Sequence, residues 1–385
     1  MQQQGITHDA RTVEARETLA SGPTENTDRL ISLDALRGFD MFWIIGGQAM
    51  VHALGRSIGL SPDNGFLAQF EHVPWQGLHF FDLIWPLFMF MVGVSIPFSL
   101  AKRREAGQST TRIYLHTLLR AIILFVLGMI AQGNLLSYNL AELHPCYSVL
   151  HGIAAGYLIA TLVSFNFKPA GQATFLGVFL LLYWAALMLI PVPGVGRGIL
   201  TPDGNAAIYI DRIVLGHFQY GENTWFLTYL SFASSVLIGV LAGEVLRSRR
   251  TPGDKVRHLL MGGAALTVLG LVWSLSLPII KLLWTSSFVL IGGGFSVLLM
   301  GLFYLVVDVL HFRRWAFPLV VIGMNSLAVY MATSVFDFRQ VGHAFVGHLA
   351  PVLGVWIGFV EACAAFLIVW SILYWMFKTK SFVRV

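Results

Sequence analysis

Charged residues are scarce in this 385-residue chain, because Asp, Glu, Lys and Arg together make up only 12% of it. An ordinary soluble domain carries about twice that share. The apolar fraction is 56% and the mean hydropathy is +0.71, which is more apolar surface than a core of this size can hide from water. The same composition excludes intrinsic disorder. The sequence therefore predicts an integral membrane protein.

Cysteines and several catalytic motifs are also few or missing. The two cysteines, Cys146 and Cys363, allow one disulfide at most and exclude a disulfide scaffold. The chain has no Gly-x-Ser-x-Gly elbow of a serine hydrolase, no His-Glu-x-x-His motif and no cysteine cluster. The glycine run 292–294 lacks the Lys and Ser/Thr of a phosphate loop and predicts close helix packing. We therefore expect no metal.

Long apolar runs are what the chain has in abundance. Ten of them can each cross about 30 Å of hydrocarbon, and they lie near residues 31–54, 79–101, 112–133, 147–166, 171–191, 226–246, 257–278, 284–308, 316–337 and 351–376. We predict an all-α, polytopic membrane bundle of about ten helices. The polar residues 1–28 are predicted to form a flexible cytoplasmic leader, and 29–385 a single transmembrane domain.

The positions of the 25 Lys and Arg residues predict the orientation of the bundle. Eighteen lie in the loops of one side and five in those of the other, while Arg37 and Arg120 lie within spans. Because basic loops stay in the cytoplasm, both termini are predicted to be cytoplasmic. This distribution explains the net charge of +5 without a nucleic-acid partner. The long outer loops 55–78 and 192–225 are where we expect function.

The first span contains polar and ionisable residues, which a membrane tolerates mainly at functional sites. Asp34, Arg37 and Gln48 share one helix face, and Arg37 and Gln48 are separated by roughly 16 Å along the axis. This face predicts a polar seam for a ligand that lies across the membrane with its anionic end inside. An ion pair between Asp34 and Arg37, and interhelical hydrogen bonding by Gln48, are the alternatives.

Five further residues are candidates for a site. Arg120, about two turns inside the third span, either binds an anion or reaches the inner headgroups. His72 directly precedes the second span and suits a general base, with a solvated loop histidine as the alternative. Asp82 either orients a neighbour or caps its helix. Asn325 and Ser326 lie in the middle of the ninth span, where they either line a cavity or join helices.

Several blocks of sequence together resemble the heparan-α-glucosaminide N-acetyltransferase family. They cover nearly the whole chain after residue 30, at Ser32–Gly38, Trp75–Leu78, Asp82–Pro86, Ile190–Gly194, Tyr209–Arg212, Leu283–Ser287 and Gly323–Ser326. Members of this family are transmembrane enzymes that move acetyl from cytosolic acetyl-coenzyme A to the amino group of a glucosamine unit on the far side. The resemblance implies an acyltransferase domain at 29–385 in the inner membrane of a bacterium.

The resemblance also implies roles for the candidate residues. The family's catalytic histidine corresponds to His72, and an important asparagine corresponds to Gln48. We predict that His72 deprotonates the acceptor, that Asp82 orients His72, and that the amides of Gln48 and Asn325 hold the oxyanion.

The other four candidates are predicted to bind acetyl-coenzyme A. Arg37 and Arg120 would meet its phosphates, which require Arg or Lys, and Asp34 and Ser326 would lie beside them. The acceptor would be a small molecule or a glycan, and a homodimer is kept open.

The sequence departs from the family pattern at three places. The family's Gln-Arg pair appears as His151–Gly152, a histidine late in the ninth span appears as Thr333, and an Asp-Pro-Glu-Gly block is replaced by Gly221–Trp225. A secondary transporter for an amino sugar is the alternative function, because ten spans and the glycine pair 46–47 also suit a transporter with broken helices.

Overall fold

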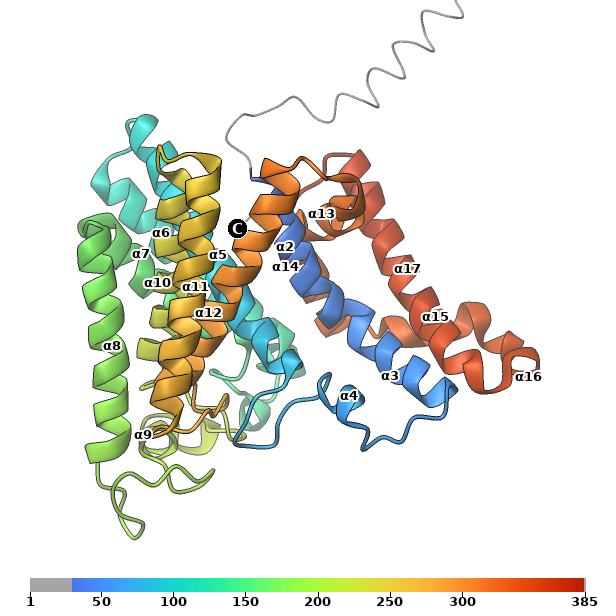
Figure 1. Ribbon diagram of the computed structural model, residues 1–385. Coiled ribbons are helices and arrows are strands. Elements are labelled where there is room, and N and C mark those ends of the chain that lie inside the picture. Colours follow the sequence, from blue (N-terminus) through green and yellow to red (C-terminus); the bar gives the residue numbers. More distant parts are fainter. Residues whose placement is uncertain (1–29, 384–385) are drawn as a thin grey trace, which may run out of the picture.

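The computed structural model describes residues 30–383, which are built from helices joined by loops (Figure 1). The predicted leader 1–28 lies outside the described residues. Within them there is no named strand, and the only β-type pairs are the isolated bridges Gln76 to Ile280 and Val192 to Gly196. The all-α class is confirmed.

Among the described residues, eight helices are long and apolar enough to cross a membrane, and the protein is therefore an integral membrane protein. They are η2–α5 (Phe80–Glu105), α6 (Thr110–Ala131), α7 (Val149–Asn166), α8 (Pro169–Leu189), α10 (Tyr229–Arg247), α11 (Pro252–Ser274), α12–η6 (Ser286–Val309) and the segment Phe338–Lys378, which ends in α17 (Ile357–Lys378). A ninth candidate is a bent pair, Arg314–Gly323 with α14 (Ser326–Val335), whose halves meet at 62°. The first half of this pair contains α13 (Phe317–Gly323).

The first predicted span, 31–54, differs from the others. It consists of α2 (Ile31–Phe42), the π-helical turn η1 (Trp43–Gly47) and α3 (Gln48–Ser57), with a kink at Gly46. This helix is not among the eight that pass on length and hydropathy, because the kink divides it into short pieces and its first piece holds three ionisable residues, Asp34, Arg37 and Asp40. With it and the bent pair, all ten predicted spans are helical.

Close helix crossings place α2 beside α13 and α5 beside α10. A Cβ atom at Gly38 would collide with the carbonyl oxygen of Leu319, and one at Gly323 would collide with that of Asp34. Gly93 of α5 and Gly239 of α10 form a similar close contact, since a Cβ atom on either residue would collide with the backbone of the other helix. Small residues allow such approaches in a bilayer. The crossing at Gly323 brings the bent pair against the polar part of α2.

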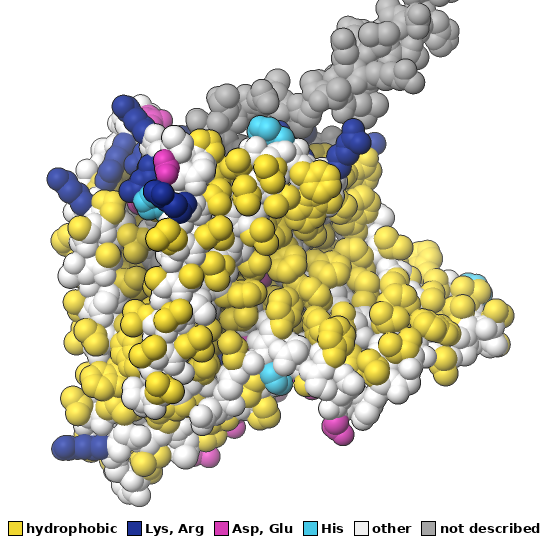
Figure 2. All heavy atoms as spheres, in the orientation of Figure 1, with side chains coloured by type: hydrophobic (Ala, Val, Ile, Leu, Met, Phe, Trp, Pro, Cys, Tyr) yellow, Lys and Arg dark blue, Asp and Glu magenta, His cyan; other side chains and the backbone are white. Residues whose placement is uncertain are grey.

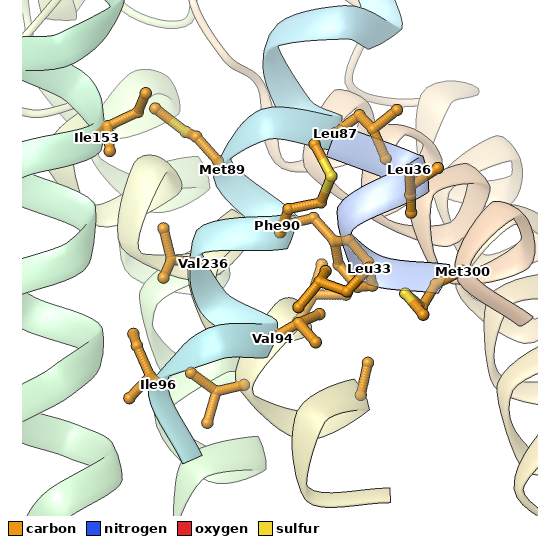
Figure 3. Packing of buried hydrophobic residues seen from close by; sticks show 14 of the residues in the cluster. Leu33, Leu36, Leu87, Met89, Phe90, Val94, Ile96, Ile153, Val236 and Met300 are labelled. Atoms are coloured by element: carbon orange, nitrogen blue, oxygen red, sulfur yellow. The ribbon is translucent and has the colours of Figure 1, made fainter. Parts of the chain in front are cut away.

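The buried core lies between α2 and the helices α5 and α12. Figure 3 shows Leu33 and Leu36 of α2 facing Leu87 and Phe90 of α5, with Met300 of α12 beside them. These side chains are all 8% exposed or less. In Figure 1, α2 and α3 run between the group α5–α12 and the helices α13–α17. The first helix thus contacts both parts of the bundle.

The two ends of the bundle differ in charge. Figure 2 shows most of the Lys and Arg side chains of this face at the end where the described chain begins. We predict that this end faces the cytoplasm. The opposite end bears the two long loops, which contain the short helices α4 (Gly65–Ala68) and α9 (Ala206–Leu215), together with α15 (Phe338–Val346) and α16 (Ala350–Leu353).

Candidate functional site

A cavity of about 470 Å³ opens between α2, α5, α6, α7 and α14. Its lining includes Asp34 and Arg37 from α2, Arg120 from α6 and Ser326 from α14. These are the four residues that the sequence predicts to hold a cofactor, and the fold brings them together from three helices. The cavity is of the size that proteins use for small-molecule sites.

Arg37 is held in place by neighbours on two helices. Its guanidinium lies 3.5 Å from Oδ1 of Asp34, one turn earlier, and donates to the hydroxyl of Ser95 on α5. Its side chain is 28% exposed, so the charge remains accessible in the cavity. The ion pair proposed as an alternative is therefore present, and it lies within the wall of the site.

Arg120 contacts an aromatic ring of the neighbouring helix α7. Its guanidinium carbon lies 4.6 Å from the centre of the Tyr157 ring on α7, a cation–π contact. Its Nε atom is buried and has no hydrogen-bond partner among the described residues. Two arginines thus line one cavity, an arrangement that suits a multiply charged anion such as a polyphosphate.

The end of the described chain forms part of the cavity wall. Phe382 and Val383 line the cavity, and Asn325 holds the backbone on both sides of Phe382. Nδ2 of Asn325 donates to the carbonyl of Ser381 at 3.3 Å, and its Oδ1 accepts from the backbone N–H of Val383 at 3.1 Å. Both ends of the amide are therefore occupied at the basic end of the bundle.

A second polar cluster lies at the opposite end. Nδ1 of His72 lies 2.8 Å from Oδ1 of Asp82, and Oδ2 of Asp82 accepts from the backbone N–H of His79 at 3.0 Å. Asp82 is 1% exposed, whereas the side chain of His72 is 53% exposed. Asp82 therefore orients His72 and caps its own helix at the same time. With Nδ1–H directed at Asp82, Nε2 is the ring nitrogen that can accept a proton.

Lys281 joins this cluster from the turn between α11 and α12. Its Nζ atom lies 3.2 Å from Oδ1 of Asp82, and 2.7 and 3.2 Å from the two ring nitrogens of His72. Its side chain is 13% exposed. Burial lowers the pKa of Lys281, and the carboxylate of Asp82 opposes this shift. The cluster thus brings an imidazole, a carboxylate and a lysine amino group within hydrogen-bond distance of one another.

Backbone contacts hold the histidine loop against the lysine turn. The N–H of Gly77 donates to the carbonyl of Ile279 at 2.9 Å, beside the bridge between Gln76 and Ile280. Lys281 is not among the site residues predicted from the sequence, where it is only one of five basic residues of the outer side. The available signal was its position two residues before the block Leu283–Ser287.

Gln48 braces the histidine loop from α3. Its Nε2 donates to the carbonyl of Phe70 at 2.7 Å, and Nε2 of His52 lies 3.5 Å from the same oxygen. The structure does not bring Gln48 and Asn325 together, because Asn325 binds the chain end beside the cavity. The prediction that the two amides hold one oxyanion is therefore not supported by their positions.

The cavity and the histidine cluster are stacked along α5. The cavity wall reaches Phe88 but includes neither Gln48 nor His72. Phe88 lies six residues after Asp82, which is roughly 9 Å of helix. Between the two sites, α2 carries Asp40, which is fully buried and has both carboxylate oxygens without a hydrogen-bond partner among the described residues.

Two curated enzymes are similar in sequence to this chain. Heparan-alpha-glucosaminide N-acetyltransferase of Homo sapiens is 27% identical over 373 residues, which cover 80% of this chain and 53% of the relative. The same enzyme of Mus musculus is 26% identical over 330 residues, covering 70% of this chain and 49% of the relative. The chain is related to these N-acetyltransferases at the family level. No family model matches the chain. It spans about half the length of these curated N-acetyltransferases.

Two of the three departures from the N-acetyltransferase pattern have structural roles here. His151 accepts at Nδ1 from the backbone N–H groups of Tyr147 and Ser148, both at 3.1 Å, and its Nε2 lies 3.1 Å from the carbonyl of Phe125. This ring therefore caps the start of α7. Thr333 bonds the carbonyls of its own helix. Neither residue contacts the cavity or the His72 cluster.

Proposed function

We propose that this protein is a transmembrane acetyltransferase, which moves acetyl from acetyl-coenzyme A to the amino group of a glucosamine-type acceptor. One observation carries the proposal: an arginine-lined cavity and an exposed, carboxylate-paired histidine lie in line along α5 at opposite ends of the bundle. A donor with a phosphate end and a reactive tip needs both sites. The relationship to named N-acetyltransferases supports the same reaction.

The donor enters from the cytoplasmic end. Its phosphates meet Arg37 and Arg120, since guanidinium groups bind phosphate oxygens with charged hydrogen bonds. Asp34 and Ser95 keep Arg37 directed into the cavity. The pantetheine arm, a flexible chain that carries the thioester at its tip, extends past Phe88 toward His72.

The reaction takes place at the far face. Nε2 of His72 accepts a proton from the acceptor nitrogen as that nitrogen attacks the thioester carbonyl carbon. The new N–C bond forms, the C–S bond breaks, and the thiolate of coenzyme A leaves with the electron pair. The proton on His72 then neutralises the thiolate, so the products are an N-acetyl sugar and coenzyme A. Asp82 stabilises the imidazolium between the two steps.

Purified protein in lipid nanodiscs tests this proposal. We expect transfer of radiolabelled acetyl from acetyl-coenzyme A to glucosamine, and stabilisation of the protein by coenzyme A in thermal unfolding. Absence of both would overturn the proposal. In inside-out vesicles of a bacterial inner membrane, the donor should act from the exposed cytoplasmic side, while the acceptor must be inside.

A transporter for an amino sugar is the second candidate. The observation that favours it is the 62° bend between α13 and α14 beside the cavity, because broken helices line substrate sites in secondary transporters. Counterflow of labelled glucosamine in proteoliposomes, without acetyl-coenzyme A, would support the transporter. Acetylation without counterflow would support the enzyme.

A further inference from the structure

The oxyanion of the proposed reaction needs a hydrogen-bond donor close to His72. Charge develops on the thioester oxygen when the amine attacks, and removal of one such donor typically costs an enzyme about 10²–10³ in kcat. The side-chain amides of Gln48 and Asn325, which the sequence predicts as donors to the oxyanion, donate to other groups. Nε2 of Gln48 donates to Phe70, and Nδ2 of Asn325 donates to Ser381. The backbone N–H of Gly77 is also used, by Ile279.

We infer that Lys281 is this donor, a catalytic residue that stabilises the oxyanion of the thioester carbonyl with its ammonium group. This inference rests on the proposed acetyl transfer. Nζ of Lys281 lies 3.2 Å from Nε2 of His72, the nitrogen that accepts the amine proton. An amine that donates to Nε2, and the carbonyl it attacks, therefore lie beside Nζ.

The hydrogen bonds of the cluster leave Lys281 a donor to spare. Nδ1–H of His72 and one N–H of Lys281 both go to Oδ1 of Asp82, at 2.8 and 3.2 Å. An ammonium group has three N–H bonds. Nζ also lies 2.7 and 3.2 Å from the two ring nitrogens of His72, so one N–H faces the ring and one remains for the substrate. The carboxylate of Asp82 favours the charged form of Lys281, whose pKa burial lowers, and in a buried position the attraction of an ammonium group for an oxyanion is stronger than in water.

The chemistry balances without consuming a proton from Lys281. As nitrogen attacks carbon, the carbonyl π electrons move to oxygen, and an N–H of Lys281 shortens its hydrogen bond to that oxygen. When the C–S bond breaks, the electrons return and the carbonyl re-forms. The proton that moves is the amine proton, carried by His72 to the departing thiolate.

Steady-state kinetics of K281M and K281R in nanodiscs test the inference. We expect K281M to lower kcat about 10²–10³-fold, with the KM for acetyl-coenzyme A within twofold of wild type. K281R keeps a donor and a charge and should retain more kcat than K281M. R339M is the matched control, since it removes an exposed cation from α15 on the same side, and we expect no change in kcat.

A second pair of variants separates this role from simple neutralisation of Asp82. If Lys281 only balanced the buried carboxylate, D82N/K281M would turn over as fast as D82N and would melt at the same or a higher temperature. We expect the double variant to be at least tenfold slower than D82N. Equal rates, or wild-type kcat in K281M, overturn the role of Lys281 while acetyl transfer stands. A wild-type protein without transfer overturns the proposed function itself.

Discussion

The carboxylate of Asp82 lies 2.8 Å from Nδ1 of His72, ten residues earlier in the chain. Asp82 is buried at the start of the second spanning helix, whereas His72 projects from the preceding loop. This contact orients the ring of His72, because the buried carboxylate holds Nδ1 in place. The alternative of a freely solvated histidine therefore does not describe His72.

Replacement of His72 by Ala is expected to reduce acetyl transfer by about 10²–10⁴-fold, the usual contribution of a general base. Binding of coenzyme A, measured by titration calorimetry, should change little, because the cavity proposed to bind its phosphates reaches Phe88 and is not lined by His72. The control is H217A, an exposed histidine of the other long outer loop. Turnover of H72A at the rate of H217A would contradict the assigned role.

Loss of an arginine charge in the cavity should weaken binding of coenzyme A more than it lowers the rate of the reaction at saturating acetyl-coenzyme A. R37Q and R120Q each remove charged hydrogen bonds worth about 1.5–3 kcal/mol, so we expect the Kd of coenzyme A to rise about 10–100-fold. R112Q, at the exposed start of α6, is the control for R120Q and should bind as wild type does. If R37Q and R120Q bind coenzyme A with wild-type affinity, the phosphate site lies elsewhere.

Asn325 is expected to act through the chain end rather than through the thioester. N325A removes the hydrogen bonds to Ser381 and Val383, each worth about 1 kcal/mol. Release of this segment should speed tryptic cleavage after Lys380, followed by mass spectrometry, and change the KM for acetyl-coenzyme A. The control N139A alters an exposed asparagine of an outer loop. A hundredfold loss of kcat with unchanged proteolysis would instead support an oxyanion role.

The buried carboxylate of Asp211 predicts a pH dependence of stability. Burial raises the pKa of Asp211 to about 6, although its oxygens accept from the backbone N–H groups of Phe226 and Trp225. Because the folded-state pKa lies above the unfolded value, the folded protein gains stability from protonation at low pH. This stability, about 3 kcal/mol, is lost as the pH rises from 4 through 6.

Thermal unfolding of wild type and D211N in detergent between pH 4 and 7.5 measures this contribution. The melting temperature of wild type should fall with rising pH relative to that of D211N, which cannot ionise at this position. D203N, at a carboxylate exposed in the same loop, should follow the wild-type profile. Parallel curves for wild type and D211N would show that Asp211 stays in one protonation state over this range.

The spans were predictable because crossing a bilayer requires about 20 apolar residues, a local property of the chain. Arg37 and Arg120 were predictable for the same reason, since a charge inside an apolar run stands out without knowledge of its partners. The kink that divides the first helix was not predicted, although the glycine pair 46–47 marks its position. The orientation of the bundle stays a prediction from the loop charges.

The hydrogen-bond partners of Asn325 could not be predicted from local sequence, because they are backbone groups of residues 56 and 58 positions later in the chain. Gln48 has an analogous partner, the carbonyl of Phe70. An amide side chain gives the same sequence signal whether it lines a site or binds backbone. Its role depends on which atoms the fold places within 3.5 Å of it.

A membrane bundle with charges inside its first and third spans is predictable from the sequence, because hydropathy and charge are properties of individual residues. The contact between Lys281 and His72, which are 209 positions apart, is visible in the folded chain alone. The same is true of the backbone partners of Gln48 and Asn325. Contacts at such separations depend on how helices cross, and the close approaches at Gly38, Gly93, Gly239 and Gly323 determine those crossings.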